Sequence, residues 1–160
     1  MDEVEILPAR ASDRDGLTEL VRELKNYERY LYQARQPGDR VADGHVDYLI
    51  QAAEEGGGAI FIAWVGDDIA GFVAGWMAVD QDPLNFPELA AHGYISDIYV
   101  LSRWRGKDIA QQLLGAIENH LRAQGARRLR IHSLARNAAA LAACRGCGFD
   151  PLEIVLEKPL

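Results

Sequence analysis

The chain is poor in cysteine. Its two cysteines, Cys144 and Cys147, have the C-x-x-C spacing of half a zinc site or of a redox pair. The sequence has no second cysteine pair, and its four histidines are scattered without metal-ligand spacing. The motif also closes an alanine-rich helical segment, whereas a redox pair opens a helix after a strand. We therefore predict two reduced thiols and no metal site.

Long apolar runs are also absent. No uninterrupted apolar stretch approaches the roughly 20 residues that a membrane-spanning helix needs. The first residues, Met1 to Glu5, have neither the basic nor the apolar region of a signal peptide. These absences predict a cytoplasmic protein without a membrane partner.

Positive charge is in short supply. The chain has 17 basic residues against 24 acidic ones, which gives a net charge of -7. This balance argues against a nucleic-acid partner and is compatible with a cationic substrate. Arg103, Arg105 and Lys107 nevertheless stand close together. An acidic protein can therefore still contain a local anion site.

The size and patterning of the chain fit one domain over residues 1–160. Its composition, 49% apolar and 26% charged, is ordinary for a globular protein. Apolar periodicity, caps and glycine turns predict strands at residues 4–7, 59–65, 69–79, 94–101, 128–134 and 154–157, and helices starting at 12 or 13, around 46–53, over 107–123 and from 137 to 148. This order predicts a mixed α/β fold in which helices flank a central sheet.

The segment from Tyr94 to Leu114 is the most informative part of the sequence. An apolar strand runs through a short basic turn directly into an amphipathic helix. The first amides of a helix have no intrahelical acceptor and lie at the positive end of the helix dipole. A turn that brings Arg105, Gly106 and Lys107 to that point predicts a site for a phosphate-bearing ligand, although a solvated basic turn is the alternative.

The element order and several motifs resemble the GNAT superfamily of N-acetyltransferases. The family's pyrophosphate loop, R/Q-x-x-G-x-G/A, is matched at Arg105, by position at Asp108, and at Ala110. Asn137-x-x-Ala140 and Gly148-Phe149 follow at the expected separation. The resemblance spans nearly the whole chain, is most specific over residues 94–149, and implies a mostly antiparallel sheet flanked by helices.

The resemblance implies acetyl-CoA as the cosubstrate. The backbone of Ile98, Tyr99 and Val100 would then lie along the pantetheine, and the amide near Tyr99 would polarise the thioester carbonyl. The resemblance also implies that Asn137 contacts the pantetheine arm, although an N-cap is its other role. The amides that would hold the pyrophosphate belong to Arg105, Gly106, Lys107, Asp108, Ile109 and Ala110.

Two residues depart from the family pattern. Asp108 stands where glycine is usual, and we expect its carboxylate to point away from the phosphates while weakening their binding. Cys144 stands where many members have a tyrosine that protonates the departing thiolate. Cys144, a water, or a tyrosine such as Tyr94 or Tyr99 can supply part of that acid catalysis. Alternatively, Cys144 is a small buried hydrophobic residue.

A proton acceptor is needed because an amine is mostly protonated at neutral pH, with a pKa of about 10.4 for lysine. Many family members use a glutamate on the fourth strand, and the candidates here are Ser96 and Asp97. Strict alternation places them on opposite faces of the sheet, but a bulge can bring either one inward. We favour Asp97 as the base because only its side chain accepts a proton, with a structural carboxylate as the alternative.

These observations predict an N-acetyltransferase that moves the acetyl group directly to a primary amine, without a metal. The acceptor is expected to be a small cationic molecule, for which Glu28, Asp39, Asp80, Asp82 and Glu88 offer acidic loop side chains. The alternatives are a peptide or protein amine, a covalent route through Cys144, and a non-catalytic module that binds coenzyme A. The sequence does not determine the oligomeric state, although members of the family it resembles are often dimers, so a homodimer is one alternative.

Overall fold

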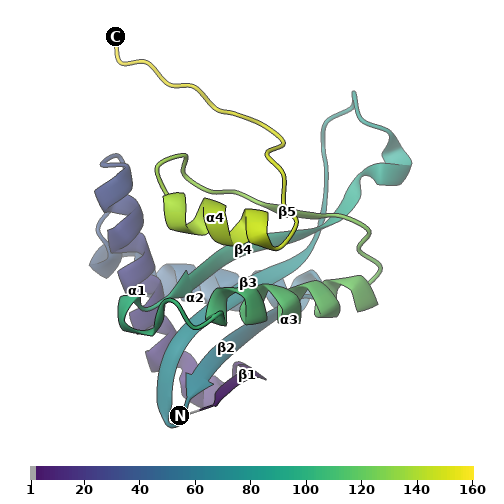
Figure 1. Ribbon diagram of the computed structural model, residues 1–160. Coiled ribbons are helices and arrows are strands. Elements are labelled where there is room, and N and C mark those ends of the chain that lie inside the picture. Colours follow the sequence, from purple (N-terminus) through teal and green to yellow (C-terminus); the bar gives the residue numbers. More distant parts are fainter. Residues whose placement is uncertain (1–2) are drawn as a thin grey trace.

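A five-stranded sheet forms the centre of the protein, whose computed structural model describes residues 3–160 (Figure 1). The strands lie side by side in chain order. Neighbours are antiparallel except for the last pair, which is parallel. The strands are β1 (Val4–Pro8), β2 (Ala59–Val65), β3 (Asp68–Val79), β4 (Ala91–Val100) and β5 (Leu129–Ile131).

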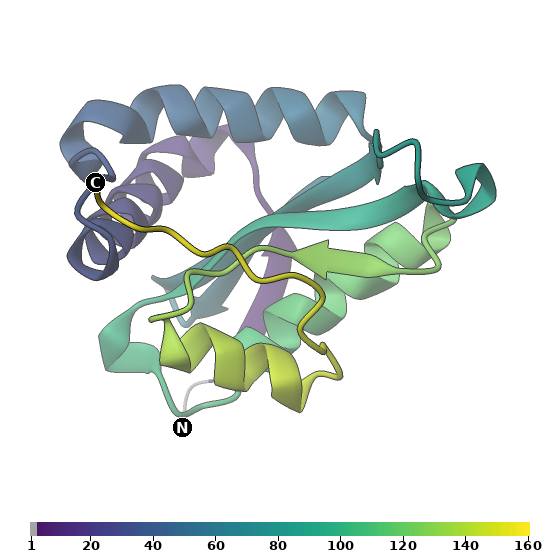
Figure 2. The same ribbon diagram turned by 90° about the horizontal axis from the view of Figure 1, so that it is seen from above.

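Helices cover both faces of this sheet (Figure 2). One face carries α1 (Arg14–Leu31) and α2 (Gly38–Glu55), and the other carries α3 (Ile109–Ala123). The short helix α4 (Ala138–Gly146) lies against α3. Single 3-10 turns occupy Ala11–Asp13, Pro87–Leu89 and Ser102–Trp104. None of the helices in the described part of the chain is long and apolar enough to cross a bilayer.

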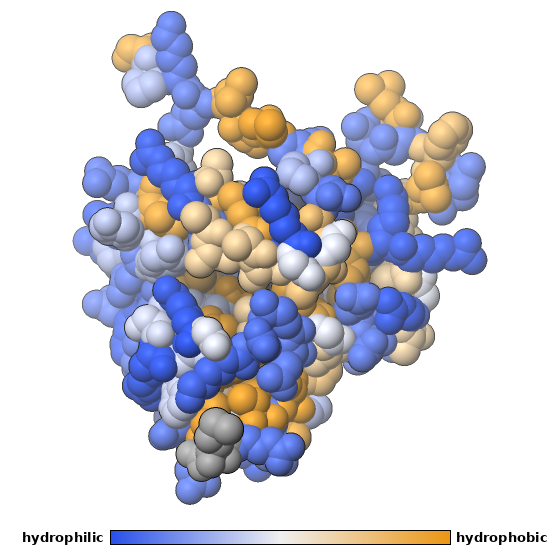
Figure 3. Space-filling view, in the orientation of Figure 1, coloured by the Kyte–Doolittle hydropathy of each residue, from blue (hydrophilic) through white to orange (hydrophobic). Residues whose placement is uncertain are grey.

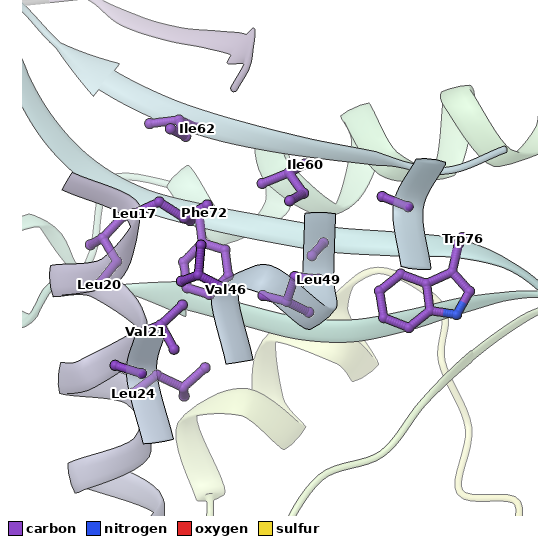
Figure 4. Close-up of a cluster of buried hydrophobic side chains, with 13 residues drawn as sticks. Leu17, Leu20, Val21, Leu24, Val46, Leu49, Ile60, Ile62, Phe72 and Trp76 are labelled. Carbon is purple, nitrogen blue, oxygen red and sulfur yellow. The ribbon is translucent and has the colours of Figure 1, made fainter. Parts of the chain in front are cut away.

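Each helical layer buries one apolar stripe against the sheet. The α1 and α2 stripes meet Phe72 and Trp76 of β3 in the cluster drawn in Figure 4. The amphipathic helix predicted after the basic turn is confirmed as α3, since the five members of its apolar stripe are no more than 2% exposed: Ile109, Leu113, Leu114, Ile117 and Leu121. Full burial of one such side chain contributes about 1.5–3 kcal/mol, so these stripes fix how the helices sit on the sheet.

The predicted mixed α/β fold is confirmed, but several element boundaries were wrong. Strand β4 begins at Ala91 rather than at residue 94, β5 covers only Leu129–Ile131 rather than residues 128–134, and α3 begins at Ile109 rather than at residue 107. Helix α2 begins at Gly38 rather than near residue 46, because the amide of Gly38 donates to Asn26 Oδ1 at 2.7 Å and fixes the first turn of the helix. Asp13 precedes α1 as predicted, but its carboxylate accepts from the amide of Arg10 at 2.8 Å instead of capping α1.

The predicted last strand at residues 154–157 does not form. Residues 151–160 have no regular structure and extend away from the sheet (Figure 1). Ile154, Val155 and Leu156 are at least 80% exposed, while Tyr32 Oη donates to Glu157 Oε2 at 2.7 Å. A strand needs a hydrogen-bonded neighbour, and the described part of the chain provides none for this segment.

Strand β4 contains a bulge that positions the site. Asp97 pairs with Ala74 and Ile95 pairs with Gly75, so Ser96 is the extra residue of β4 at this point. As a result Asp97 faces α1 and α2, while Ile98 packs on the α3 side. The pairing of β4 with β5 also stops at Ile95, and the rest of β4 has no strand on that side among the described residues.

Two glycine substitutions test this packing. A Cβ at Gly58 would overlap the carbonyl oxygen of Gly75 and lie 2.6 Å from Trp76 Cβ, whereas a Cβ at Gly44 in α2 meets nothing within 4 Å. Gly58→Ala should lower the free energy of unfolding by about 1–3 kcal/mol through overpacking. Gly44→Ala should raise it by about 0.5–1 kcal/mol through helix propensity. Denaturant unfolding of both variants measures these changes. Equal changes in the free energy of unfolding would contradict the described packing.

Candidate active site

A cavity of about 380 Å³ lies between the end of β4, the start of α3 and the helix α4. Leu24 and Tyr27 of α1 complete its wall. Ten of the residues predicted for the site line this cavity together: Ile98, Tyr99, Val100, Arg105, Gly106, Asp108, Ile109, Ala110, Asn137 and Cys144. Lys107 belongs to the same turn without lining the cavity, and Asp97 does not line it either, since its side chain contacts Lys25 of α1 and His45 of α2. Figure 3 shows weakly apolar surface where the alanine-rich α4 crosses this face.

The turn between β4 and α3 offers a row of free amides. Gly106 has φ +81° and Asp108 has φ +57°, so the chain turns sharply before α3 begins at Ile109. No group within residues 3–160 accepts a hydrogen bond from the amides of residues 106–111, and no side chain caps α3. Such amides at the positive end of a helix dipole suit the diphosphate of a nucleotide.

Positive side chains stand beside these amides. The guanidinium of Arg105 lies 5.6 Å from the ring centroid of Tyr27 and 5.7 Å from that of Tyr99, and its Nε donates to the carbonyl of Val100 at 3.2 Å. Lys107 Nζ lies 5.0 Å from the Trp104 ring. Contacts between cations and ring faces hold both charges near the turn, where they favour an anion. The donor set therefore fits a phosphate-bearing ligand.

Asn137 fills the N-cap role that the sequence suggested. Its Oδ1 accepts from the amide of Ala140 at 3.1 Å, at the start of α4. Asn137 also lines the cavity, and because the cap uses the side-chain oxygen, the donors of the side-chain NH2 remain available. The expected contact with the pantetheine arm stays a prediction.

Directly before the cavity-lining segment of β4, Asp97 is the centre of a buried polar cluster. Its Oδ2 lies 2.9 Å from His45 Nε2 of α2 and 3.1 Å from Lys25 Nζ of α1, and Ser96 Oγ donates to Oδ1 at 2.7 Å. Burial alone would raise the pKa of Asp97, but the hydrogen bond from His45, the charge of Lys25 and the bond from Ser96 outweigh it and lower the pKa to about 2.

The expectation that Asp97 is the catalytic base therefore needs correction. A carboxylate with a pKa of about 2 holds a proton too weakly to take one from an amine at neutral pH. Its side chain is only 3% exposed and already has three partners. Asp97 is suited to hold and orient its neighbours rather than to accept the proton.

The prediction from sequence missed His45 and Lys25. They lie on two different helices, and the fold brings them to β4 from 52 and 72 positions away in the chain. Neither residue stands in a motif, and the histidines look scattered in the sequence. The only local signal was the uncertain choice between Ser96 and Asp97, which the bulge resolves.

His45 also begins a row of aromatic rings along this face. Successive ring centroids are 5.7 Å apart, and the row runs from α2 over β3 and β4 to the end of β5. Its members are His45, Tyr48, Trp76, Tyr94 and His132. Rings packed in tilted and edge-to-face geometry stabilise this face, with Trp76 buried in the middle of the row and Tyr48 half exposed.

Comparison with known proteins decides the family. Residues 19–149 match the acetyltransferase (GNAT) family. The chain belongs to this family. It is 31% identical over 116 residues to aminoglycoside N(6')-acetyltransferase type 1 of Stenotrophomonas maltophilia, which covers 72% of this chain and 74% of that protein. It is also 31% identical over 88 residues to the uncharacterized N-acetyltransferase YycN of Bacillus subtilis, 55% of this chain and 54% of that protein.

Solved structures share the GNAT fold. Aminoglycoside N-acetyltransferase AAC(6')-Iy in complex with CoA superposes with a TM-score of 0.74 at 18% identity, over 100% of this chain and 96% of that one. A putative acetyl transferase from Pyrococcus furiosus has a TM-score of 0.72 at 20% identity, over 99% and 100%. The predicted family and fold are thus confirmed, and the protein is an acetyl-CoA-dependent N-acetyltransferase.

Among the residues that the structure describes in this GNAT enzyme, Asp108 is the one residue other than glycine whose φ is positive. Aspartate tolerates the left-handed region better than most residues, but glycine adopts it without strain. Asp108 lines the cavity, so its charge would lie near a diphosphate held by this turn. We predict that Asp108→Gly and Asp108→Asn bind CoA about 3- to 10-fold more tightly, because either change removes a like charge worth about 1 kcal/mol at this range.

Calorimetric titration with CoA measures this effect. Asp67→Asn, which removes an exposed carboxylate from the β2–β3 turn, is the matched control and should leave the affinity unchanged. Unaltered or weaker binding in both Asp108 variants would contradict the prediction.

Cys144 lines the cavity but is a poor acid for this GNAT enzyme. It is 6% exposed, and burial, followed by the nearby Cys147, raises the pKa of its thiol. A coenzyme thiol has a pKa of about 8.5, so proton transfer from Cys144 to the leaving sulfur is uphill. We predict that Cys144→Ala keeps kcat within about 3-fold of the wild type, since full acid catalysis would be worth about 100-fold or more. Steady-state kinetics beside Cys147→Ala test this, and a 100-fold loss confined to Cys144→Ala would restore Cys144 as the acid.

Proposed function

We propose that this enzyme transfers the acetyl group of acetyl-CoA directly to the primary amine of a small cationic molecule. The observation that carries the proposal is the placement of two distinct sets of groups along β4. Ile98, Tyr99 and Val100 line the cavity next to the free amides, whereas Tyr94 and Asp97 of the same strand belong to the aromatic row and to the buried polar cluster. Two substrates held at neighbouring segments of one strand would be close enough for direct transfer.

The cavity residues would bind the donor, which supplies the acetyl group. The amides of residues 106–111, with Arg105 and Lys107 beside them, would hold the diphosphate. The backbone of Ile98, Tyr99 and Val100 would lie along the pantetheine, and an amide near Tyr99 would polarise the thioester carbonyl. Burial raises the pKa of the Tyr99 hydroxyl, which therefore stays protonated at neutral pH.

The acceptor surface would recognise a cation mainly through aromatic rings. The acidic side chains expected there are largely paired: Glu28 lies 3.2 Å from Lys25, Asp80 lies 3.1 Å from Arg130, and Asp39 lies 3.6 Å from Arg22. The net charge of -7 still attracts cations at long range, and the ring faces bind them at short range. The relative from Stenotrophomonas maltophilia is named for aminoglycosides, which are polycationic amines, and supports this acceptor class.

Direct transfer is favoured over a covalent route through Cys144. Within residues 3–160 no basic side chain hydrogen-bonds to the Cys144 thiol, and burial raises its pKa. A nucleophilic cysteine needs an adjacent base or a lowered pKa. Proximity of the two substrates would then supply much of the rate.

The proposal also covers the domain organisation, cellular location and oligomeric state of the protein. We place one acetyltransferase domain over residues 1–160 in the cytosol, where the free thiols Cys144 and Cys147 stay reduced. We also propose a homodimer, which the exposed apolar side chains of residues 152–156 support by offering surface for a second copy.

A panel of amines tests the acceptor class. Release of free coenzyme thiol is followed with aminoglycosides, polyamines, free lysine and short peptides at equal concentration. We expect kcat/KM at least about 10-fold higher for polycationic small amines than for peptides, a difference of about 1.4 kcal/mol in transition-state binding. Turnover restricted to peptides, or CoA binding without turnover of any amine, would contradict the proposal.

A further inference from the structure

Lys25, His45 and Asp97 form a cluster of titratable side chains that the assigned donor site does not use. They come from α1, α2 and β4, and the carboxylate of Asp97 lies 3.1 Å from Lys25 Nζ and 2.9 Å from His45 Nε2. The side chain of Asp97 is 3% exposed, whereas that of His45 is 23% exposed. Asp97 is therefore buried, whereas the ring of His45 reaches solvent.

The hydrogen bond between Asp97 and His45 has a defined direction. A carboxylate whose pKa is about 2 is ionised at neutral pH and has only acceptor atoms. The shared hydrogen therefore belongs to Nε2 of His45, which donates it to Asp97 Oδ2. In the neutral ring Nδ1 then carries the lone pair, and it is the nitrogen that can take up a proton.

The cluster is joined to the donor cavity through neighbouring residues of the chain. Asp97 directly precedes Ile98, and Lys25 directly follows Leu24, and both of these neighbours line the donor cavity. His45 is also the first ring of the aromatic row, 5.7 Å from Tyr48. An amine bound along that row would be within reach of the His45 ring, directly or through one water.

We propose that His45 is the general base of the reaction and that Asp97 is its positioning residue. The inference rests on the proposed function, namely acetylation of an amine. Lys25 balances the charge of Asp97, and the bulge at Ser96 turns the carboxylate toward α2. This pair resembles other carboxylate–imidazole pairs, in which the carboxylate fixes the tautomer of the imidazole and the other ring nitrogen accepts a proton from the substrate.

The proton balance is as follows. The ammonium group of the acceptor loses one proton to Nδ1 of His45, and the neutral nitrogen attacks the acetyl carbonyl carbon. A new C–N bond forms, and the C–S bond breaks with its electron pair left on sulfur. The nitrogen then gives a second proton to that sulfur, while His45 releases the first proton to water through its exposed edge. The products are the amide, the free thiol and one proton.

Charged and titratable groups surround His45. Its Nε2 contacts Asp97 of β4, which stays ionised, and its ring packs against Tyr48 of its own helix. Lys25 of α1 contacts the same carboxylate oxygen and is paired with Glu28. Tyr94 of β4 follows in the aromatic row, and burial, then Asp97, raises the pKa of its hydroxyl, which stays neutral.

The test is the pH dependence of kcat/KM from pH 5.5 to 9.5 with the best amine of the panel. In the wild type we expect kcat/KM to rise with pH near neutrality and then to level off, and we call this rise the neutral limb of the profile. His45→Gln should lower kcat/KM at pH 7 about 100-fold and remove that limb, leaving a slow rise toward alkaline pH as the amine itself deprotonates. Asp97→Asn should lower kcat about 10-fold or more and shift the limb, with KM for acetyl-CoA unchanged.

His120→Gln is the matched control, because this histidine lies on α3 across the sheet and contacts the carbonyl of Gly57. It should keep the wild-type profile. Thermal melting and CoA titration show whether each variant is folded. Added imidazole should restore at least about a tenth of the wild-type rate to His45→Ala, as a diffusible base replaces the ring.

The outcomes separate the two claims. If the wild type acetylates no amine, the proposed function fails and the base has no reaction to serve. If the wild type is active but folded His45→Gln keeps the neutral limb and loses less than about 3-fold in rate, only the role of His45 is overturned. Failure of imidazole to rescue folded His45→Ala would equally count against it.

Discussion

The site depends on the early end of the pairing between β4 and β5. The two strands are parallel neighbours from Gly93 to Ile95, and beyond that point β4 continues alone on this side within the described chain. Backbone groups that would otherwise be used in the sheet are left for a ligand. The cavity opens in the resulting gap, with α4 as its opposite wall. The bulge at Ser96 lies at the same point and turns Asp97 toward α1 and α2. Two irregularities at one point of β4, the end of the pairing and the bulge, thus shape the cavity and the Asp97 cluster.

Local electrostatics work against the overall charge of the protein. With a net charge of -7 the molecule as a whole repels the anionic coenzyme. The first turn of α3 compensates through free amides, the helix dipole, Arg105 and Lys107, which all act over a few ångströms where screening is weak. Asp108 opposes them from within the same turn. An acidic surface that favours a cationic acceptor and a small basic turn that favours an anionic donor are compatible because they act at different ranges.

Local patterns in the sequence predicted those parts of the protein that form from neighbouring residues. The apolar stripe of α3, the basic turn before it and the cap at Asn137 each depend on contacts a few positions apart, and each is found as expected. The Asp97 cluster was not predictable in this way, because Lys25 and His45 reach β4 only through the packing of two helices. The strand expected at residues 154–157 failed for a related reason, since an apolar pattern cannot supply the neighbour that a strand requires.

The central claim is that the amides at the start of α3 bind the diphosphate of the coenzyme. Amide proton and nitrogen shifts of the isotope-labelled protein, recorded during titration with CoA and separately with pantetheine, test it most directly. Pantetheine lacks the diphosphate, so it should shift the amides of residues 98–100 but leave those of 106–111 unchanged. CoA should shift both groups. Equal responses of residues 106–111 to the two compounds, or no response to CoA, would contradict the account.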